Sequence, residues 1–381
     1  MRQQLSFGMR LSRPHQGTFL TLYNRLRLRV NQYFDAVVLK PNGDVIDHPN
    51  VVCLHEQDNG IGWKHTNWRT GRAVVTRNRE LVVQFILTLA NYEYVFAYKF
   101  NQSGGIDIET RATGIVSCVN IDPDKTSEYG NVVQPGVLAQ NHQHIFAIRI
   151  DPAIDGCKNS IVQEESLPVP MNAKTNPQGN YYEVAKTTLK TSQWADLAPF
   201  NNRVFKVINP NVKNPISGRP VGYKLVPPAT QLLLADKRSK QARRAAFAQH
   251  HLWLTQYRDH ELWAAGPYPY QSNDEVGGVQ DMVDRADSIE NEDVVMWSVF
   301  CLTHNPRVED WPVMYDFPHI GLLMLSVLMV EIGLSRFTKF HCDRQTSSQR
   351  TRVSTYLATR IWRVGSTRMA SSRMGMVAAA Q

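Results

Sequence analysis

Apolar segments in the central part of the chain are short and separated by turn residues. Leu81 to Ala90 is almost continuously apolar, which predicts a strand buried on both faces. Tyr92 to Phe100 is rich in aromatic residues and predicts the next strand. Residues 101–105 form a glycine-containing turn signal, and apolar and polar residues then alternate from Ile106 to Val116. These segments predict a β-hairpin, and residues 31–316 as a whole predict a large all-β sandwich of many short strands.

Another strand is predicted from His142 to Ile150. Because side chains alternate along a strand, His142, His144 and Phe146 share one face, and two imidazoles at positions i and i+2 can bind one metal ion. Such pairs also occur by chance as ordinary surface or core histidines. A mononuclear site needs a third ligand, and His304 is one of several distant histidines that could supply it. Spacing alone does not choose among them.

Two other segments suggest a helix and a membrane span. Residues 238–250, around KQARRAAFAQ, predict a short basic helix on the surface. The most membrane-like run, Ile320 to Val330, is interrupted by Glu331. A spanning helix needs about 20 apolar residues, so we expect no membrane anchor. The opening residues also lack the pattern of a secretory signal, and a cytoplasmic or peroxisomal location is therefore expected.

The formal net charge of +8 is concentrated at the two ends. Residues 1–30 contain six arginines and no acidic residue, and residues 335–381 contain nine Lys or Arg and only Asp343. One interpretation is that the ends are arms for nucleic acid or a membrane surface. The other is that they are out-of-frame or mis-spliced sequence, which explains why acidic residues and strand patterning are lost at the same boundaries. We therefore leave 1–30 and 317–381 unassigned and expect no nucleic-acid or membrane partner.

Several motifs in residues 31–316 occur together and in a fixed order. Thr88-Leu89-Ala90-Asn91-Tyr92-Glu93-Tyr94 matches the pattern T-x-x-N-Y-[DE]-Y, and Asn141-His142-Gln143-His144 follows about fifty residues later. Three further blocks, at 53–70, 208–225 and 304–314, belong to the same ordered set of motifs. With these motifs the segment resembles the catalytic domain of copper amine oxidases, a large distorted β-sandwich.

The resemblance implies a set of site residues and a reaction. Copper would be bound by His142, His144 and His304. Tyr92 would be oxidised in place to topaquinone and would form a Schiff base with the substrate, while Asn91 and Glu93 hold and orient its ring. The implied reaction converts a small primary amine, O2 and water into an aldehyde, ammonium and hydrogen peroxide.

Two further expectations come from the same resemblance. Asp151 and Asp293 match ligands of a second, peripheral site for a cation such as calcium, although Ala153 stands where the family often has another aspartate. The family also forms homodimers, and a homodimer is therefore expected for this chain.

The aspartate that serves as general base in the family has no counterpart in this sequence. Its expected place lies within residues 1–30, which contain no Asp or Glu. Asp35 is a candidate substitute, but it matches a different part of the family pattern. The sequence therefore predicts a primary-amine oxidase, with a copper-binding remnant of the family that lacks the base as the alternative. A basic nucleic-acid-binding protein is a third hypothesis, which depends on the ends alone.

Overall fold

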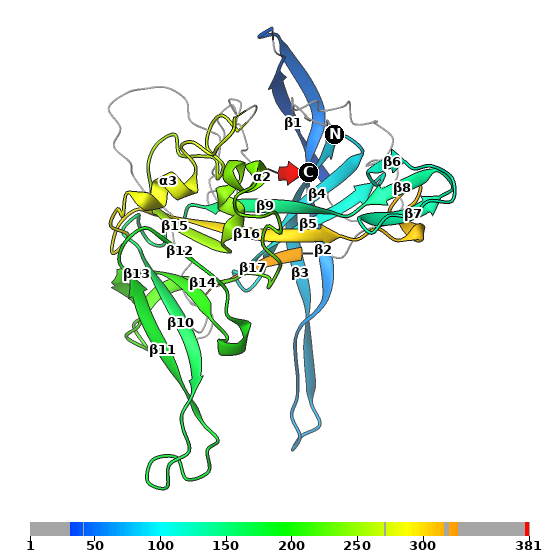
Figure 1. The fold of residues 1–381 in the computed structure, drawn as a ribbon. Helices are drawn as coiled ribbons and strands as arrows, with labels where there is room; N and C mark the ends of the chain where they lie inside the picture. Colours follow the sequence, from blue (N-terminus) through cyan, green and yellow to red (C-terminus); the bar gives the residue numbers. More distant parts are fainter. Residues whose placement is uncertain (1–30, 41, 270–271, 316–319, 327–377, 381) are drawn as a thin grey trace. The chain divides into compact units, whose positions relative to one another are not determined.

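A computed structural model describes residues 31–40, 42–269, 272–315, 320–326 and 378–380 of the chain (Figure 1). The unassigned segment 1–30 and most of 317–381 lie outside these residues. The chain folds into two compact units, one built on His142–Thr303 and the other on the residues up to Asn141 together with His304–Met324. Nearly all of the regular structure is strand, which confirms the prediction of an all-β fold.

In the second unit, six strands follow one another as antiparallel neighbours. In their order in the sheet they are β1 (Asn31–Leu39), β2 (Val45–Thr66), β3 (Ala73–Leu89), β4 (Tyr92–Asn101), β5 (Ile106–Gly114) and β17 (Ile320–Ser326). The predicted hairpin is therefore confirmed as β4 and β5. A small sheet of β6 (Cys118–Asn120), β8 (Val137–Gln140) and β7 (Gly130–Gln134) belongs to the same unit.

Aromatic side chains of β4 form much of the core of this unit. Tyr94 and Phe96 are almost fully buried, and Phe96 stacks on Phe85 of β3 with ring centroids 5.1 Å apart. β3 begins at Ala73, well before the apolar run that predicted it, because its first half pairs with β2 in a long hairpin. Most side chains of that half are exposed on both faces, so no alternating pattern marks it in the sequence.

The first unit contains two sets of strands. One has the order β14 (Pro220–Val226), β13 (Val204–Lys213), β10 (Ser160–Pro168) and β11 (Tyr182–Leu189). The other is a five-stranded sheet with the order β12 (Gln193–Ala195), β15 (Leu252–Gln256), β16 (Val294–His304), β9 (His142–Ile150) and β18 (Ala378–Ala380). β9 has the bounds that the sequence predicted, and it lies beside β16.

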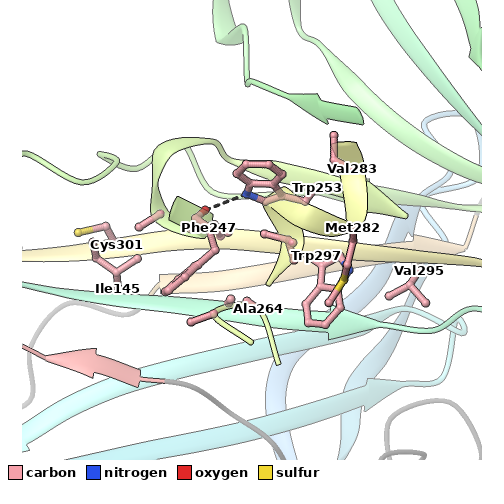
Figure 2. Close-up of a cluster of buried hydrophobic side chains, with 14 residues drawn as sticks. Ile145, Phe247, Trp253, Ala264, Met282, Val283, Val295, Trp297 and Cys301 are labelled. Carbon is pink, nitrogen blue, oxygen red and sulfur yellow. Dashed lines mark hydrogen bonds between the residues drawn. The ribbon is translucent and has the colours of Figure 1, made fainter. Parts of the chain in front are cut away.

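One face of the five-stranded sheet packs into a hydrophobic core (Figure 2). Alternate residues of the two central strands enter it, among them Ile145 from β9 and Trp297 from β16. The core is covered by α3 (Val279–Asp284) and by the 3-10 helix η2 (Ala246–Gln249), whose Phe247 carbonyl accepts a hydrogen bond of 2.8 Å from the Trp253 indole. The intervening residues of β9 and β16 consequently face the other side of the sheet.

The predicted basic surface helix is confirmed only in its first part, as α2 (Lys240–Arg244), because the following residues form η2, which buries Phe247 and Ala248 in the core. The Ser239 hydroxyl caps α2 by accepting a hydrogen bond from the backbone of Ala242 at 3.1 Å. Its arginines contact other residues of the unit, because Arg243 lies 2.8 Å from a carboxylate oxygen of Asp274 and Arg244 donates a hydrogen bond of 2.8 Å to the carbonyl of Pro269. Among the described residues there is no helix of the length and hydropathy that a membrane crossing requires.

Candidate metal centre

The histidine pair of β9 lies on the face of the sheet that is turned away from the hydrophobic core. His142 and His144 flank Gln143, whose side chain points to the core side, and their ring centroids are 4.7 Å apart in an edge-on arrangement. His144 is buried and His142 is half-buried. The period of two predicted from the sequence thus brings both imidazoles to one place.

His304 is the last residue of β16 and completes a cluster with this pair. The potential ligand nitrogens of His142, His144 and His304 all lie within 4.8 Å of one another. Within the described ranges this is the one group of three or more His, Cys, Asp or Glu side chains that close together. Two nitrogens bound to one ion at about 2 Å each are at most about 4 Å apart, so small ring rotations would let the three share an ion. Three neutral imidazoles suit copper or zinc.

Asp310 fixes the orientation of the His304 ring. Its Oδ2 lies 3.1 Å from Nε2 of His304, and the carboxylate also accepts hydrogen bonds from the backbone and the guanidinium of Arg307 at 2.8 and 2.9 Å. Burial alone would raise the pKa of Asp310, but the bonds from Arg307 and His304 outweigh it and hold that pKa below its usual range. The carboxylate therefore accepts the proton on Nε2, which leaves the lone pair of Nδ1 for a metal.

Burial also controls the charge of His304 itself. It is almost completely buried, and desolvation lowers the pKa of its imidazole more than the Asp310 carboxylate raises it. A neutral ring is the form that binds metals. Sequence analysis did not single out Asp310, although the signal was present in the spacing of six residues that separates it from His304.

Tyr92 lies directly beside this third histidine. Its hydroxyl oxygen is 3.2 Å from Nδ1 of His304, its ring stacks on Tyr94 at 5.9 Å, and only 6% of the residue is exposed. Burial raises the pKa of the Tyr92 phenol, although a hydrogen bond from the Ser117 backbone opposes this. The phenol therefore keeps its proton and donates it to Nδ1, consistent with the proton on Nε2 facing Asp310.

The turn before Tyr92 is held by a close backbone contact. Leu89 pairs with Tyr92 across a turn of Ala90 and Asn91, and Ala90 has a φ of 53°. Gly114 of β5 lies opposite Tyr92, where a Cβ atom would come within 2.5 Å of the Asn91 carbonyl oxygen. Glycine is required at this point because any side chain would push β5 away from the turn.

The two residues expected to orient the Tyr92 ring differ in their contacts. Glu93 accepts a hydrogen bond of 2.7 Å from the hydroxyl of Thr88, its partner across the hairpin. Asn91 is exposed, and its backbone carbonyl accepts a hydrogen bond of 2.8 Å from Ile115. Their roles toward the ring stay predictions.

Other predicted site residues lie elsewhere. Asp35 is exposed on β1 and accepts a hydrogen bond of 2.8 Å from the backbone of Asn50. Asp151 is buried beside Arg149, with 3.4 Å between the carboxylate and the guanidinium. The backbone carbonyl of Asp293 accepts a hydrogen bond of 2.7 Å from Tyr257. In the described part of the chain, Asp151 and Asp293 do not belong to a cluster of three ligand-type side chains, and calcium binding there stays a prediction.

Comparisons with known proteins point to one family. The family model "Copper amine oxidase, enzyme domain" matches residues 27–324. Copper amine oxidase 1 of Aspergillus niger is 66% identical over 287 residues, which cover 75% of this chain and 43% of that protein. The peroxisomal copper-containing diamine oxidase 1 of Nicotiana tabacum is 41% identical over 300 residues, covering 77% of this chain and 38% of that protein.

A solved structure supports the same relationship. The copper-containing benzylamine oxidase of Hansenula polymorpha aligns with a TM-score of 0.77 and 41% identity, over 82% of this chain and 48% of that one. The β-rich architecture of the chain is therefore that of this structure. The chain spans less than half the length of each of these three proteins.

Proposed function

The chain belongs to the copper amine oxidase family, and from this we propose that it catalyses the oxidative deamination of primary amines. A primary amine, O2 and water are converted to an aldehyde, ammonia and hydrogen peroxide. The observation that carries the proposal is the contact of 3.2 Å between the Tyr92 hydroxyl and Nδ1 of His304, which belongs to the three-histidine cluster. A tyrosine that is oxidised in place must lie beside the metal ligands, and the contact of Tyr92 with His304 supports this role.

Copper is proposed to be held by His142, His144 and His304. The donor set fits because all three are imidazoles and their nitrogens converge. When bound, copper and the quinone formed from Tyr92 supply the reactivity toward O2 and the electron sink for the amine. Calcium at Asp151 and Asp293 is also proposed from the family resemblance, although the Asp151 carboxylate lies 3.4 Å from the guanidinium of Arg149.

Three features of the chain prepare this site. Asp310 holds the Nε2 proton of His304 and so presents Nδ1 as the ligand atom. Burial raises the pKa of the Tyr92 phenol and so keeps it protonated beside Nδ1 of His304, the atom that would bind the metal. The close approach of Gly114 fixes the turn from which Tyr92 projects. Together they bring the oxidisable ring and the ligand nitrogen to one place before any metal arrives.

The general base is the part of the mechanism with the least support. Among the described residues, Glu93 adjoins Tyr92 in the sequence and Asp310 contacts His304, but Glu93 accepts a hydrogen bond from Thr88, and Asp310 is engaged by Arg307 and His304. Neither is in a position to take a proton from a substrate without losing those partners. The second candidate function is therefore a copper-binding protein of this family that forms the site without turning over an amine.

Association and location are further parts of the proposal. We propose a homodimer, as the family resemblance implies, which light scattering on the purified protein would test. We also propose a peroxisomal or cytoplasmic location. The tobacco relative is named as peroxisomal, and this supports the former.

The first test is phenylhydrazine staining of the copper-loaded protein, with Tyr92→Phe as the control. A chromophore in the wild-type protein that the variant lacks is expected. Peroxide release with a primary amine is measured separately, because it depends on the base and the chromophore does not. Bound copper without a chromophore would exclude the oxidase function, and a chromophore without turnover would leave the copper-binding alternative.

A further inference from the structure

Gln143 is the residue between the two histidines of β9, and its side chain points to the opposite face. The amide nitrogen lies 3.2 Å from the carbonyl of Leu232, 3.2 Å from the hydroxyl of Thr303 and 3.4 Å from the sulfur of Cys301. The amide oxygen accepts a hydrogen bond of 2.9 Å from the backbone of Leu234. Both ends of the amide are thus engaged, which fixes its rotamer and its plane.

These contacts connect the two strands that carry the metal ligands. Gln143 is covalently linked to His142 and His144, and its contact residue Thr303 is covalently linked to His304. A shift of β9 against β16 would move the histidine pair relative to the third histidine and would also break the bond between Gln143 and Thr303. The amide therefore opposes a displacement of the strands that would separate the three nitrogens.

The segment 230–234, which Gln143 also holds, is itself well anchored. The hydroxyl of Thr230 accepts a hydrogen bond of 3.0 Å from the backbone of Cys301, and its carbonyl lies 3.0 Å from Nε2 of His251. The backbone of Leu233 donates to the carbonyl of Ala248 at 3.1 Å. Gln143 therefore connects β9 and β16 to a rigid support and not to a mobile loop.

We propose that Gln143 is a positioning residue of the metal centre, which sets the placement of His142 and His144 against His304 from the back of the sheet. This inference rests on the proposed copper site. It goes beyond that site because it assigns a role to a side chain that touches neither metal nor substrate. Replacing a residue of this kind changes the geometry of the bound metal, whereas replacing an ordinary buried amide changes only the stability of the fold.

The test uses Gln143→Met, which keeps the length of the side chain and removes the amide. Its control is Gln193→Met on β12 of the same sheet, away from the histidines. Copper affinity is measured by competition with a chelator on the metal-free protein, the Cu(II) electron paramagnetic resonance spectrum reports ligand geometry, and melting temperature reports stability. We expect Gln143→Met to weaken copper binding about tenfold, as other residues that orient ligands do, and to change the spectrum. The control should leave both unchanged.

Each outcome decides the proposal. A lower melting temperature of Gln143→Met with unchanged affinity and spectrum would overturn it, because the amide would then serve stability alone. If that variant does not fold, Thr303→Val removes a single acceptor, and the same criteria apply to it. Wild-type protein that binds copper but forms no chromophore would defeat the proposed function and leave the affinity comparison valid. Wild-type protein that binds no copper would defeat both.

Discussion

The hydroxyl of Tyr92 lies 3.2 Å from Nδ1 of His304, although 212 positions separate the two residues in the sequence. The other nitrogen of the same ring faces Asp310 at 3.1 Å. One imidazole therefore connects an oxidisable phenol to a buried carboxylate, and its tautomer is set by the carboxylate. Several measurements can test what this arrangement and its surroundings do.

Asp310→Asn should weaken copper binding about 10- to 100-fold and slow formation of the chromophore. The amide can donate to His304 as well as accept from it, so the proton on Nε2 is no longer enforced, and the pair with Arg307 is lost. Chelator competition on the metal-free protein measures the affinity. Glu309→Gln, an exposed neighbour, is the matched control. Equal affinity in the two variants would show that Asp310 does not orient the ligand.

Gly114→Ala should lower the free energy of unfolding by about 2 kcal/mol, because the new methyl group would overlap the carbonyl of Asn91. The control is Gly43→Ala, where φ is also positive, at 88°, but no atom lies within 4 Å of the added Cβ. The difference between the two variants in urea titrations separates steric overlap from backbone strain. A Gly114 variant no less stable than the Gly43 variant would contradict the contact.

The free energy of unfolding should fall as pH rises from about 4.5 to about 7, because of the carboxyl group of Glu275. Burial raises the pKa of its carboxyl to about 7, against a hydrogen bond from the backbone of Phe247. The folded state thus holds the proton more tightly than the unfolded state. Stability is therefore greatest below the pKa of Glu275 in the unfolded state. It declines by up to about 3 kcal/mol as pH rises through the pKa in the folded state.

Urea titrations at pH 5 and pH 8 test this effect. Glu275→Gln should remove the decline, so that the variant gains stability relative to the wild-type protein at pH 8. Glu290→Gln, at an exposed carboxylate, should keep the wild-type dependence. If the Glu275 and Glu290 variants showed the same dependence of stability on pH, the burial of Glu275 would have no effect on stability.

Asp196 joins two histidines, and its removal should destabilise the fold more at pH 5.5 than at pH 8. Its carboxylate lies 2.9 Å from His250 and 3.0 Å from His251. Despite its burial, bonds from the histidines lower the pKa of Asp196, and the bonds from Asp196 and Thr230 raise the pKa of His251 above the value that burial would give.

The sign follows from these two directions. The raised pKa of His251 contributes stability below its unfolded value, which is lost as pH rises through the folded value. The lowered pKa of Asp196 contributes stability above its unfolded value, so between pH 5.5 and pH 8 only the histidine contribution changes. Thermal melts of Asp196→Asn at the two pH values measure the loss of stability. An equal loss at both values would show that a charged His251 does not stabilise the fold through Asp196.

Local pattern was enough to predict two of the strands that carry the site, β9 and β4, but not β16, which carries His304. The alternation from His142 to Ile150 predicted both the bounds of β9 and the shared face of its histidines. The aromatic run after Tyr92 and the turn at 101–105 predicted β4 and β5. These features depend on side-chain periodicity and turn chemistry, which neighbouring residues in the sequence determine.

Long-range partners could not be predicted in this way. Spacing did not distinguish His304 from other histidines, and only the resemblance selected it. Gln143 acts through contacts whose partners are set by the pairing of β16 with β9, which no local pattern encodes. Asp310 contacts residues only three and six positions away, but its role depends on the His304 ring, whose function the spacing alone did not indicate. The outer half of the β2–β3 hairpin was missed because exposure on both faces removes the alternation that marks a strand.

The position of His304 at the end of β16 also bears on when the centre can form during synthesis of the chain. A ribosome adds about 5 to 20 residues per second, so His304 emerges roughly 10 to 40 s after Tyr92. Residues 92–144 are synthesised long before the third imidazole exists, but β9 gains its neighbour β16 only with the stretch that ends at His304. Ions met in that interval find at most two of the three site histidines, and capture by all three must wait for β16.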